Sequence, residues 1–281
     1  MDRHYSPTQK VFIYIFYVIL LVFFLLPVVY IFAMSLKTEA EVLDKVHLFN
    51  FYPKRPTLEN FGRVIKNVRM DMYLANSAKL VITTSIGVLL AAFPSAFALS
   101  RGNFKRKELV MMGVLFFQMI SPIIISISIY WYYSKLHLLN TYSGLALIYI
   151  AIHLPFTTFL MKGVFDAIPR DLDEAAHIDG CSRFATLLKV IIPTAVPGIA
   201  SATIFNSINA WSQFIIPFFL ISDNKLYPVS VGILQAQGSY QDVSTHYLAA
   251  ASVIGLFPAV LLVLFLQKFI IRALTAGAVK G

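Results

Sequence analysis

Six long apolar runs constrain this chain more than any other feature of its sequence. They cover about residues 11 to 36, 75 to 100, 108 to 134, 141 to 164, 198 to 221 and 247 to 271. A bilayer core about 30 Å thick requires roughly 20 apolar residues per helix, so each run is long enough to cross it. With 58% apolar and 13% charged residues, the 281-residue chain has more apolar surface than one soluble core buries. We therefore predict an all-α, polytopic membrane protein with six transmembrane helices in one domain, residues 11 to 271.

Positive charge in the predicted loops indicates the orientation of these spans. The basic residues between spans two and three and between spans four and five are Arg101, Lys105, Arg106, Lys107, Lys162, Arg170, Arg183 and Lys189. Because basic loops stay on the cytoplasmic side, we expect both loops, residues 1 to 10 and the tail at 272 to 281 to be cytoplasmic. The first outer loop, residues 37 to 73, departs from this rule with seven basic and five acidic residues. Basic loops also account for the net charge of +9, so we expect no nucleic-acid partner.

The spans contain almost no ionisable side chains, which argues against an ion-coupled transporter. A charge at mid-membrane costs from about 2.5 to over 10 kcal/mol and is retained where a mechanism uses it. His153 is the one ionisable residue well inside a span. We interpret it as a hydrogen-bonded packing residue, with a proton relay as the alternative.

Sequence motifs of enzymes are absent as well. The chain has no HExxH metal helix, no GxSxG nucleophile elbow and no GxxxxGK[ST] phosphate loop. Its single cysteine, Cys181, excludes an internal disulfide and a thiol-rich metal site. We predict no catalytic residue, no metal site and no cofactor bound by this chain, so any ATP that drives it binds to a partner.

The connection from residues 165 to 197 is predicted to form two short helices. Asp171 and Glu174 have capping-box spacing, and Leu172, Ala175 and Ala176 then share one helix face. Gly180 suits the end of this helix. Ser182 is suited to cap the second helix, whose apolar face is formed by Phe184, Leu187, Leu188 and Ile191.

Two motifs in this order resemble a known family. Glu174-Ala175-Ala176, three residues, Gly180, nine residues and then Val190-x-Ile192-Pro193 resembles the EAA loop of ABC importer permeases. The longer string PRDLDEAAHIDG is similar to the carbohydrate-uptake branch. The ending LTAGAVKG, residues 274 to 281, resembles the tail of the maltose-type second permease subunit.

The resemblance implies a type I ABC importer permease fold in a bacterial plasma (inner) membrane. It implies a second homologous permease, two ATPase subunits that hold ATP and Mg, and an external solute-binding protein as partners. The EAA loop would couple to the ATPase through Asp171, Glu174, Ala175, Ala176, Asp179, Gly180 and Phe184. The tail would reach between the ATPase subunits through Thr275, Gly277, Lys280 and Gly281. A frayed terminus is the alternative for the tail.

The fifth span contains candidate residues for a translocation path. Asn206, Asn209 and Gln213 form one amide stripe, which fits either hydrogen bonds to sugar hydroxyls or bridges to neighbouring helices. Related permeases often have W-N-E-F here, whereas this chain has Trp211-Ser212-Gln213-Phe214 and lacks the carboxylate. In the outer loop after this span, Gln237, Gly238, Tyr240 and Gln241 are candidates for contact with the solute-binding protein.

The predicted function is therefore that of a non-catalytic permease subunit in an ATP-driven, binding-protein-dependent importer of a sugar or oligosaccharide. Three alternatives stay open: an ABC permease for a non-sugar solute such as glycerol phosphate, a secondary transporter or channel acting alone, and a membrane-embedded enzyme. A lone transporter predicts functional charges in its spans and no coupling loop.

Overall fold

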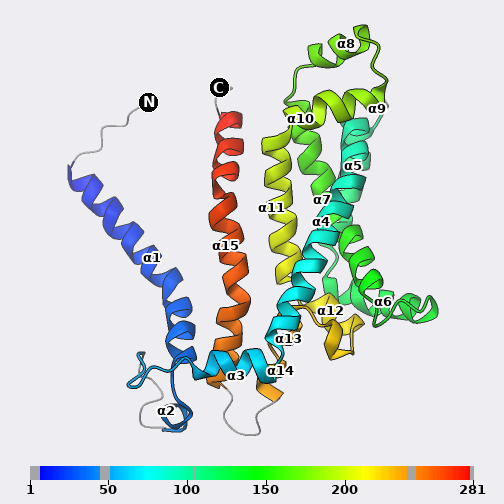
Figure 1. Cartoon of the computed structure of the whole chain (residues 1–281). Helices are drawn as coiled ribbons and strands as arrows, with labels where there is room; N and C mark the ends of the chain where they lie inside the picture. Colours follow the sequence, from blue (N-terminus) through cyan, green and yellow to red (C-terminus); the bar gives the residue numbers. More distant parts are fainter. Residues whose placement is uncertain (1–6, 45–50, 104, 239–244, 279–281) are drawn as a thin grey trace. The chain divides into compact units, whose positions relative to one another are not determined.

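A computed structural model describes residues 7–44, 51–103, 105–238 and 245–278 of the chain, and side chains only as far as residue 264 at the C-terminal end (Figure 1). All regular elements among these residues are helical. The chain divides into two compact units. The first draws on residues 1–70 and 233–256, and the second on residues 71–232 and 257–281.

The first unit is built around a long apolar helix and short polar ones. Its elements are α1 (Pro7–Ser35), α2 (Glu39–Leu43), α3 (Glu59–Asn67), α14 (Gln235–Gly238) and the beginning of α15 (Thr245–Ala278). The spanning window of α1 has a mean hydropathy of 2.9 and buries none of its residues within the protein. A helix that is apolar on all sides and unpacked is suited to lipid or to another membrane protein.

Asn60 closes the end of α1 from within the same unit. Its Nδ2 donates hydrogen bonds of 2.8 Å to the carbonyl oxygens of both Ser35 and Lys37. The Asn60 side chain is buried. Carbonyl oxygens at the C-terminal end of a helix have no N–H partner inside the helix, so the Asn60 side-chain amide supplies the missing hydrogen-bond donor. The turn after α1 is therefore fixed by a residue on α3.

The second unit contains most of the helices. They are α4 (Met70–Arg101), α5 (Lys107–Phe116), η2 (Phe117–Met119), α6 (Pro122–Lys135), α7 (Tyr142–Asp166), α8 (Asp171–Ile178), α9 (Arg183–Thr186), η3 (Leu187–Ile191), α10 (Ile192–Thr194), α11 (Val196–Ser212), α12 (Ile215–Leu220), η4 (Asn224–Leu226), α13 (Val229–Gly232) and the end of α15. Among them, α7 packs closely on α11. A Cβ on Gly198 of α11 would overlap both methyl groups of Val164 on α7, so only glycine permits this approach.

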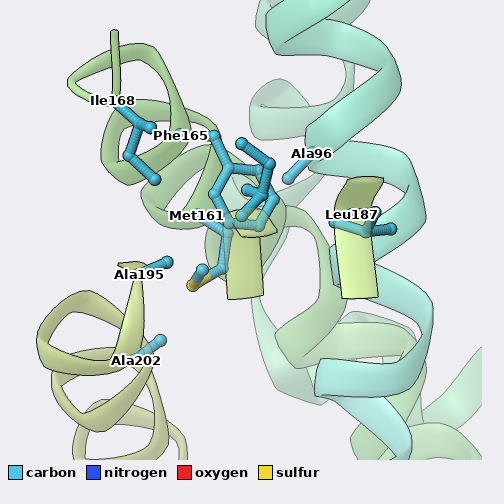
Figure 2. Close-up of a cluster of buried hydrophobic side chains, with 8 residues drawn as sticks. Ala96, Met161, Phe165, Ile168, Leu187, Ala195 and Ala202 are labelled. Atoms are coloured by element: carbon cyan, nitrogen blue, oxygen red, sulfur yellow. The ribbon is translucent and has the colours of Figure 1, made fainter. Parts of the chain in front are cut away.

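A buried apolar cluster joins α4, α7 and α11 to the loop between α7 and α11. Its members are Ala96, Met161, Phe165, Ile168, Leu187, Ile191, Ala195 and Ala202. Figure 2 shows Met161 and Phe165 between Ala96 and Leu187 on one side and Ala195 and Ala202 on the other. The loop is thus anchored in the helix bundle by side chains at both of its ends.

Four continuous helices among the described residues are long and apolar enough to cross a membrane. They are Thr8–Ser35, Met70–Arg101, Tyr142–Asp166 and Thr245–Leu264. A fifth candidate joins Arg183–Thr194 to Val196–Ser212 across a bend of 82°, visible in Figure 1 where α9 and α10 turn into α11. These match four of the predicted runs and part of another.

Two predicted spans are interrupted. The run at 108 to 134 is divided into α5, η2 and α6, because Pro122 lacks an N–H and holds Ser121 out of the helical region, at φ −57° and ψ 133°. The run at 198 to 221 breaks at Gln213, whose ψ of 117° is extended, before α12 begins. Neither run is one continuous helix, contrary to the simplest reading of the hydropathy.

Candidate functional site

The helix α8 is closed at its C-terminal end by its own backbone. Gly180 has φ +77°, a conformation that glycine adopts without strain. Its N–H donates to the His177 carbonyl at 3.0 Å, and the Cys181 N–H donates to the Ala176 carbonyl at 2.9 Å. This pair of bonds is a Schellman motif and confirms Gly180 as the end of the helix.

The beginning of α8 differs from the prediction. The capping position is occupied by Arg170, which makes no side-chain capping bond, and Asp171 lies inside the first turn. Asp171 and Glu174 therefore do not form a capping box. Together with Asp173 they place three carboxylates in the first turn, where the positive end of the helix dipole favours them.

The second helix of the loop begins as predicted but changes its pitch. The Ser182 side chain accepts a hydrogen bond of 3.3 Å from the Ala185 N–H, which confirms the cap. From Leu187 to Ile191 the chain forms a π-helix, η3. Leu187 and Ile191 are buried, whereas Phe184 and Leu188 are exposed. Two of the four residues of the predicted apolar face, Leu187 and Ile191, therefore face the core.

One face of α8 is exposed at the surface of the described chain. Asp171, Glu174, Ala175 and Ile178 are all exposed, and their spacing of three, four and seven residues places them on one side of the helix. Ile178 is 87% exposed, so almost all of this large apolar side chain is available for contact with another protein. Ala176 on the opposite side is buried, while Ala175 is not, so the predicted face of Leu172, Ala175 and Ala176 is only partly correct.

The inner side of α8 is held by an ion pair to the end of α4. The Nε of Arg101 lies 2.6 Å from Oδ2 of Asp173, with side chains 13% and 17% exposed. Arg101 Nη2 also donates to the Ile168 carbonyl at 3.0 Å. The sequence identifies Arg101 only as one of several basic residues that indicate orientation, and no local pattern pairs it with Asp173.

A second polar link joins the ends of α4 and α7. The Ser100 hydroxyl donates to Asp166 Oδ1 at 2.6 Å, and Lys162 Nζ donates to Asp166 Oδ2 at the same distance. Ser100 is buried, whereas Lys162 is partly exposed and Asp166 is exposed. The last two residues of α4 therefore contact both the end of α7 and the beginning of the loop.

A cavity of about 560 Å³ lies beside the ion pair between Arg101 and Asp173. It is lined by Pro94, Phe97, Ala98, Arg101, Gly102, Arg170, Asp173, Glu174, His177, Arg183, Phe184, Thr186 and Leu187. Most of these residues come from α4, α8, α9 and η3, while Gly102 follows α4 and Arg170 precedes α8. Side-chain packing between α8 and α4 is absent over this volume, so polar contacts bridge the two helices here.

The predicted amide stripe of α11 divides into two environments. Asn206 is fully buried, and its Oδ1 accepts a hydrogen bond of 2.8 Å from Thr157 on α7. Asn209 and Gln213 are partly exposed, and Asn209 Nδ2 bonds to its own helix at the Phe205 carbonyl. Trp211 is buried. Asn206 thus bridges two helices, whereas Asn209 and Gln213 retain exposed surface.

His153 lies on α7 one turn before Thr157. Its Nδ1 is 2.7 Å from the Tyr149 carbonyl oxygen, and the ring is buried. This environment agrees with a hydrogen-bonded packing residue, as expected from its position in the sequence.

The remaining predicted contact residues fall at the edges of the described chain. Gln237 is exposed in α14, which ends at Gly238, while Tyr240 and Gln241 lie outside the described residues. Thr275 and Gly277 belong to the last turns of α15, and Lys280 and Gly281 lie outside the described residues.

Comparison with known proteins shows which family this chain is similar to. Residues 83–276 match the family described as binding-protein-dependent transport system inner membrane component. A sulfoquinovosyl glycerol transport system permease of Agrobacterium fabrum is 33% identical over 94% of this chain and 91% of its own length. A trehalose/maltose transport system permease of Thermococcus litoralis is 36% identical over 81% of this chain and 82% of its own.

A solved structure has the same fold. It is a bacterial ABC transporter involved in the import of the acidic polysaccharide alginate, and one of its chains superposes with a TM-score of 0.78 at 22% identity. The match covers 95% of this chain and 99% of that one. The resemblance carried by the loop and the tail is therefore confirmed, and the chain belongs to the family of inner membrane components of binding-protein-dependent transport systems.

Proposed function

We propose that this chain is the permease subunit of an ATP-driven importer and forms half of the translocation path for a sugar or oligosaccharide. The similar permeases described above serve sulfoquinovosyl glycerol and trehalose or maltose, and another serves diacetylchitobiose. All of these solutes carry sugar units. The family assignment does not favour a secondary transporter or channel that acts alone.

The observation that carries the proposal is the exposed face of α8. Asp171, Glu174, Ala175 and Ile178 present two carboxylates, a small residue and a large apolar one on a helix whose other side is anchored. A protruding face of this composition fits a groove on another protein, with Ile178 as its apolar contact. In our proposal the groove belongs to an ATPase subunit, one for each of two homologous permeases, and ATP and Mg bind to the ATPases.

Glu174→Ala tests this docking. Truncating one partner of a hydrogen-bonded charge pair at an interface costs about 2 to 5 kcal/mol, so ATPase affinity should fall at least about 30-fold. Glu108→Ala is the matched control, because Glu108 is likewise an exposed carboxylate in the first turn of a helix. The measurement is co-purification of the cognate ATPase with the permease, followed by ATP-dependent uptake in vesicles. Normal association and normal uptake in Glu174→Ala would contradict the docking.

In the proposed membrane arrangement the chain crosses the bilayer six times. The crossings are α1, α4, the interrupted pair α5 and α6, α7, the pair α11 and α12, and α15. The basic residues around Arg101 and in the loop at 165–197 then face the cytoplasm, as do both termini. Cysteine labelling from either side of the membrane, at Lys105 and at Lys225, would test the orientation.

On the outer side, Gln237, Gly238, Tyr240 and Gln241 are proposed to contact a solute-binding protein. Another similar solved structure is a bacterial alginate ABC transporter in complex with an alginate pentasaccharide-bound periplasmic protein. Within the bilayer, Asn209 and Gln213 are the preferred candidates for solute contact, because Asn206 and Trp211 are buried. Deletion of residues 237–241 should abolish stimulation of the ATPase by the binding protein but leave the complex assembled. The tail residues Thr275, Gly277, Lys280 and Gly281 are proposed to reach the ATPases.

A further inference from the structure

The two sides of α8 have different partners. The face with Glu174 and Ile178 is exposed, whereas Asp173, on the opposite side, lies against Arg101 at the end of α4. Both carboxylate oxygens of Asp173 are buried, and neither accepts a hydrogen bond from the described residues. The Arg101 guanidinium is therefore the group that neutralises this carboxylate. Removing either charge leaves the other in a poorly solvated position.

Arg101 is also tied to the elements on both sides of it. It is the last residue of the 32-residue helix α4, and its Nη2 holds the Ile168 carbonyl in the turn that leads into α8. The neighbouring Ser100 holds Asp166 at the end of α7. A movement of α8 would thus reach α4 directly and α7 through the same two residues.

The cavity beside the Arg101–Asp173 ion pair determines how a displacement can pass from α8 to α4. Where side chains pack closely, a helix moves its neighbour by steric contact alone. Here about 560 Å³ separates parts of α8, α9 and α4, with Arg101 and Asp173 on its wall. The ion pair therefore spans the region in which packing does not transmit displacement.

We propose that Arg101 and Asp173 are positioning residues that form a strut, which transmits displacement of α8 by the ATPase to the transmembrane helix α4. This inference rests on the proposed docking of the ATPase on α8. It assigns separate roles to neighbouring residues of one helix: Glu174 and Ile178 bind the partner, while Asp173 passes the movement on.

Asp173→Asn and Arg101→Gln test the strut, because each keeps the side chain's approximate size and removes its charge. The complex is reconstituted in proteoliposomes with its ATPase and binding protein, and solute uptake and ATP hydrolysis are measured together. We expect the ATPase to remain bound and hydrolysis to stay within about twofold, while solute transported per ATP falls about tenfold. Arg183→Gln is the matched control, since this arginine lines the same cavity but is exposed on α9.

The reversed pair, Arg101→Asp with Asp173→Arg, should recover transport per ATP to within about threefold of the original, which a merely structural role for each charge does not predict. Arg101→Lys, which retains the charge, should lie closer to the original than Arg101→Gln. Unchanged transport per ATP in both single variants would overturn the strut. Loss of ATPase binding in every variant would overturn it too, because the pair would then belong to folding or docking.

The two proposals fail in distinguishable ways. An error in the docking proposal appears as normal ATPase association in Glu174→Ala. An error in the strut appears as a normal ratio of transport to hydrolysis in Asp173→Asn, whatever the Glu174 variant does.

Discussion

Replacing Ile178 by alanine separates binding from folding at the exposed face of α8. The Ile178 side chain is 87% exposed, so its truncation removes almost no packing from the permease itself. If the ATPase buries this side chain, loss of three carbon atoms at about 0.8 kcal/mol each weakens binding by about 2.4 kcal/mol, or about 50-fold in Kd. The free energy of unfolding of the isolated permease should change by less than about 0.5 kcal/mol, as for other surface substitutions.

Both quantities are measurable on one preparation. The permease in nanodiscs is titrated with purified ATPase to obtain Kd, and its thermal unfolding is followed without the ATPase. Leu188→Ala is the control, because Leu188 is also a large exposed apolar residue of the same loop but lies outside α8. An unchanged Kd for Ile178→Ala would refute the reasoning. So would a lowered melting temperature of the isolated permease, because the side chain would then be packed rather than free.

Three further predictions concern the packing and hydrogen bonding of the long helices. Gly198→Ala should destabilise the purified permease by about 1 to 3 kcal/mol, because the new Cβ overlaps Val164, and Val164→Ala should restore most of the melting temperature. Asn60→Ala leaves two carbonyls near the end of α1 without their donor, a loss of about 2 kcal/mol that should appear as faster proteolysis of the first loop. Thr157→Val removes the donor to Asn206 and should cost about 1 kcal/mol in thermal unfolding in detergent.

In the loop at 165–197, the sequence predicted where one helix ends and the next begins better than it predicted which helix faces are buried. Gly180 and Ser182 act as expected because a left-handed turn and a hydroxyl cap depend on one residue and its immediate backbone. The prediction of an apolar face from Phe184 to Ile191 is correct for only half of its residues. A π-helical turn changes the angle between successive side chains, and nothing in the order of Leu187 and Leu188 signals it.

Long-range contacts were beyond what one sequence reveals. Arg101 and Asp173 are 72 positions apart, and their pairing depends on how α4 and α7 pack. The same holds for Asn206, whose partner Thr157 lies on a different helix. Apolar length likewise predicted where the chain is lipid-compatible, but not that Pro122 and Gln213 would interrupt two of the runs.

The closed C-terminal end of α8 also affects the entropy of complex formation. A segment of eight residues that became ordered only on binding would lose about 1 kcal/mol of backbone entropy per residue, which would weaken the complex accordingly. The Schellman bonds at Gly180 and the buried Ala176 keep this helix formed in the free chain. A partner therefore meets a preorganised surface, and its binding does not bear the entropic cost of folding this helix.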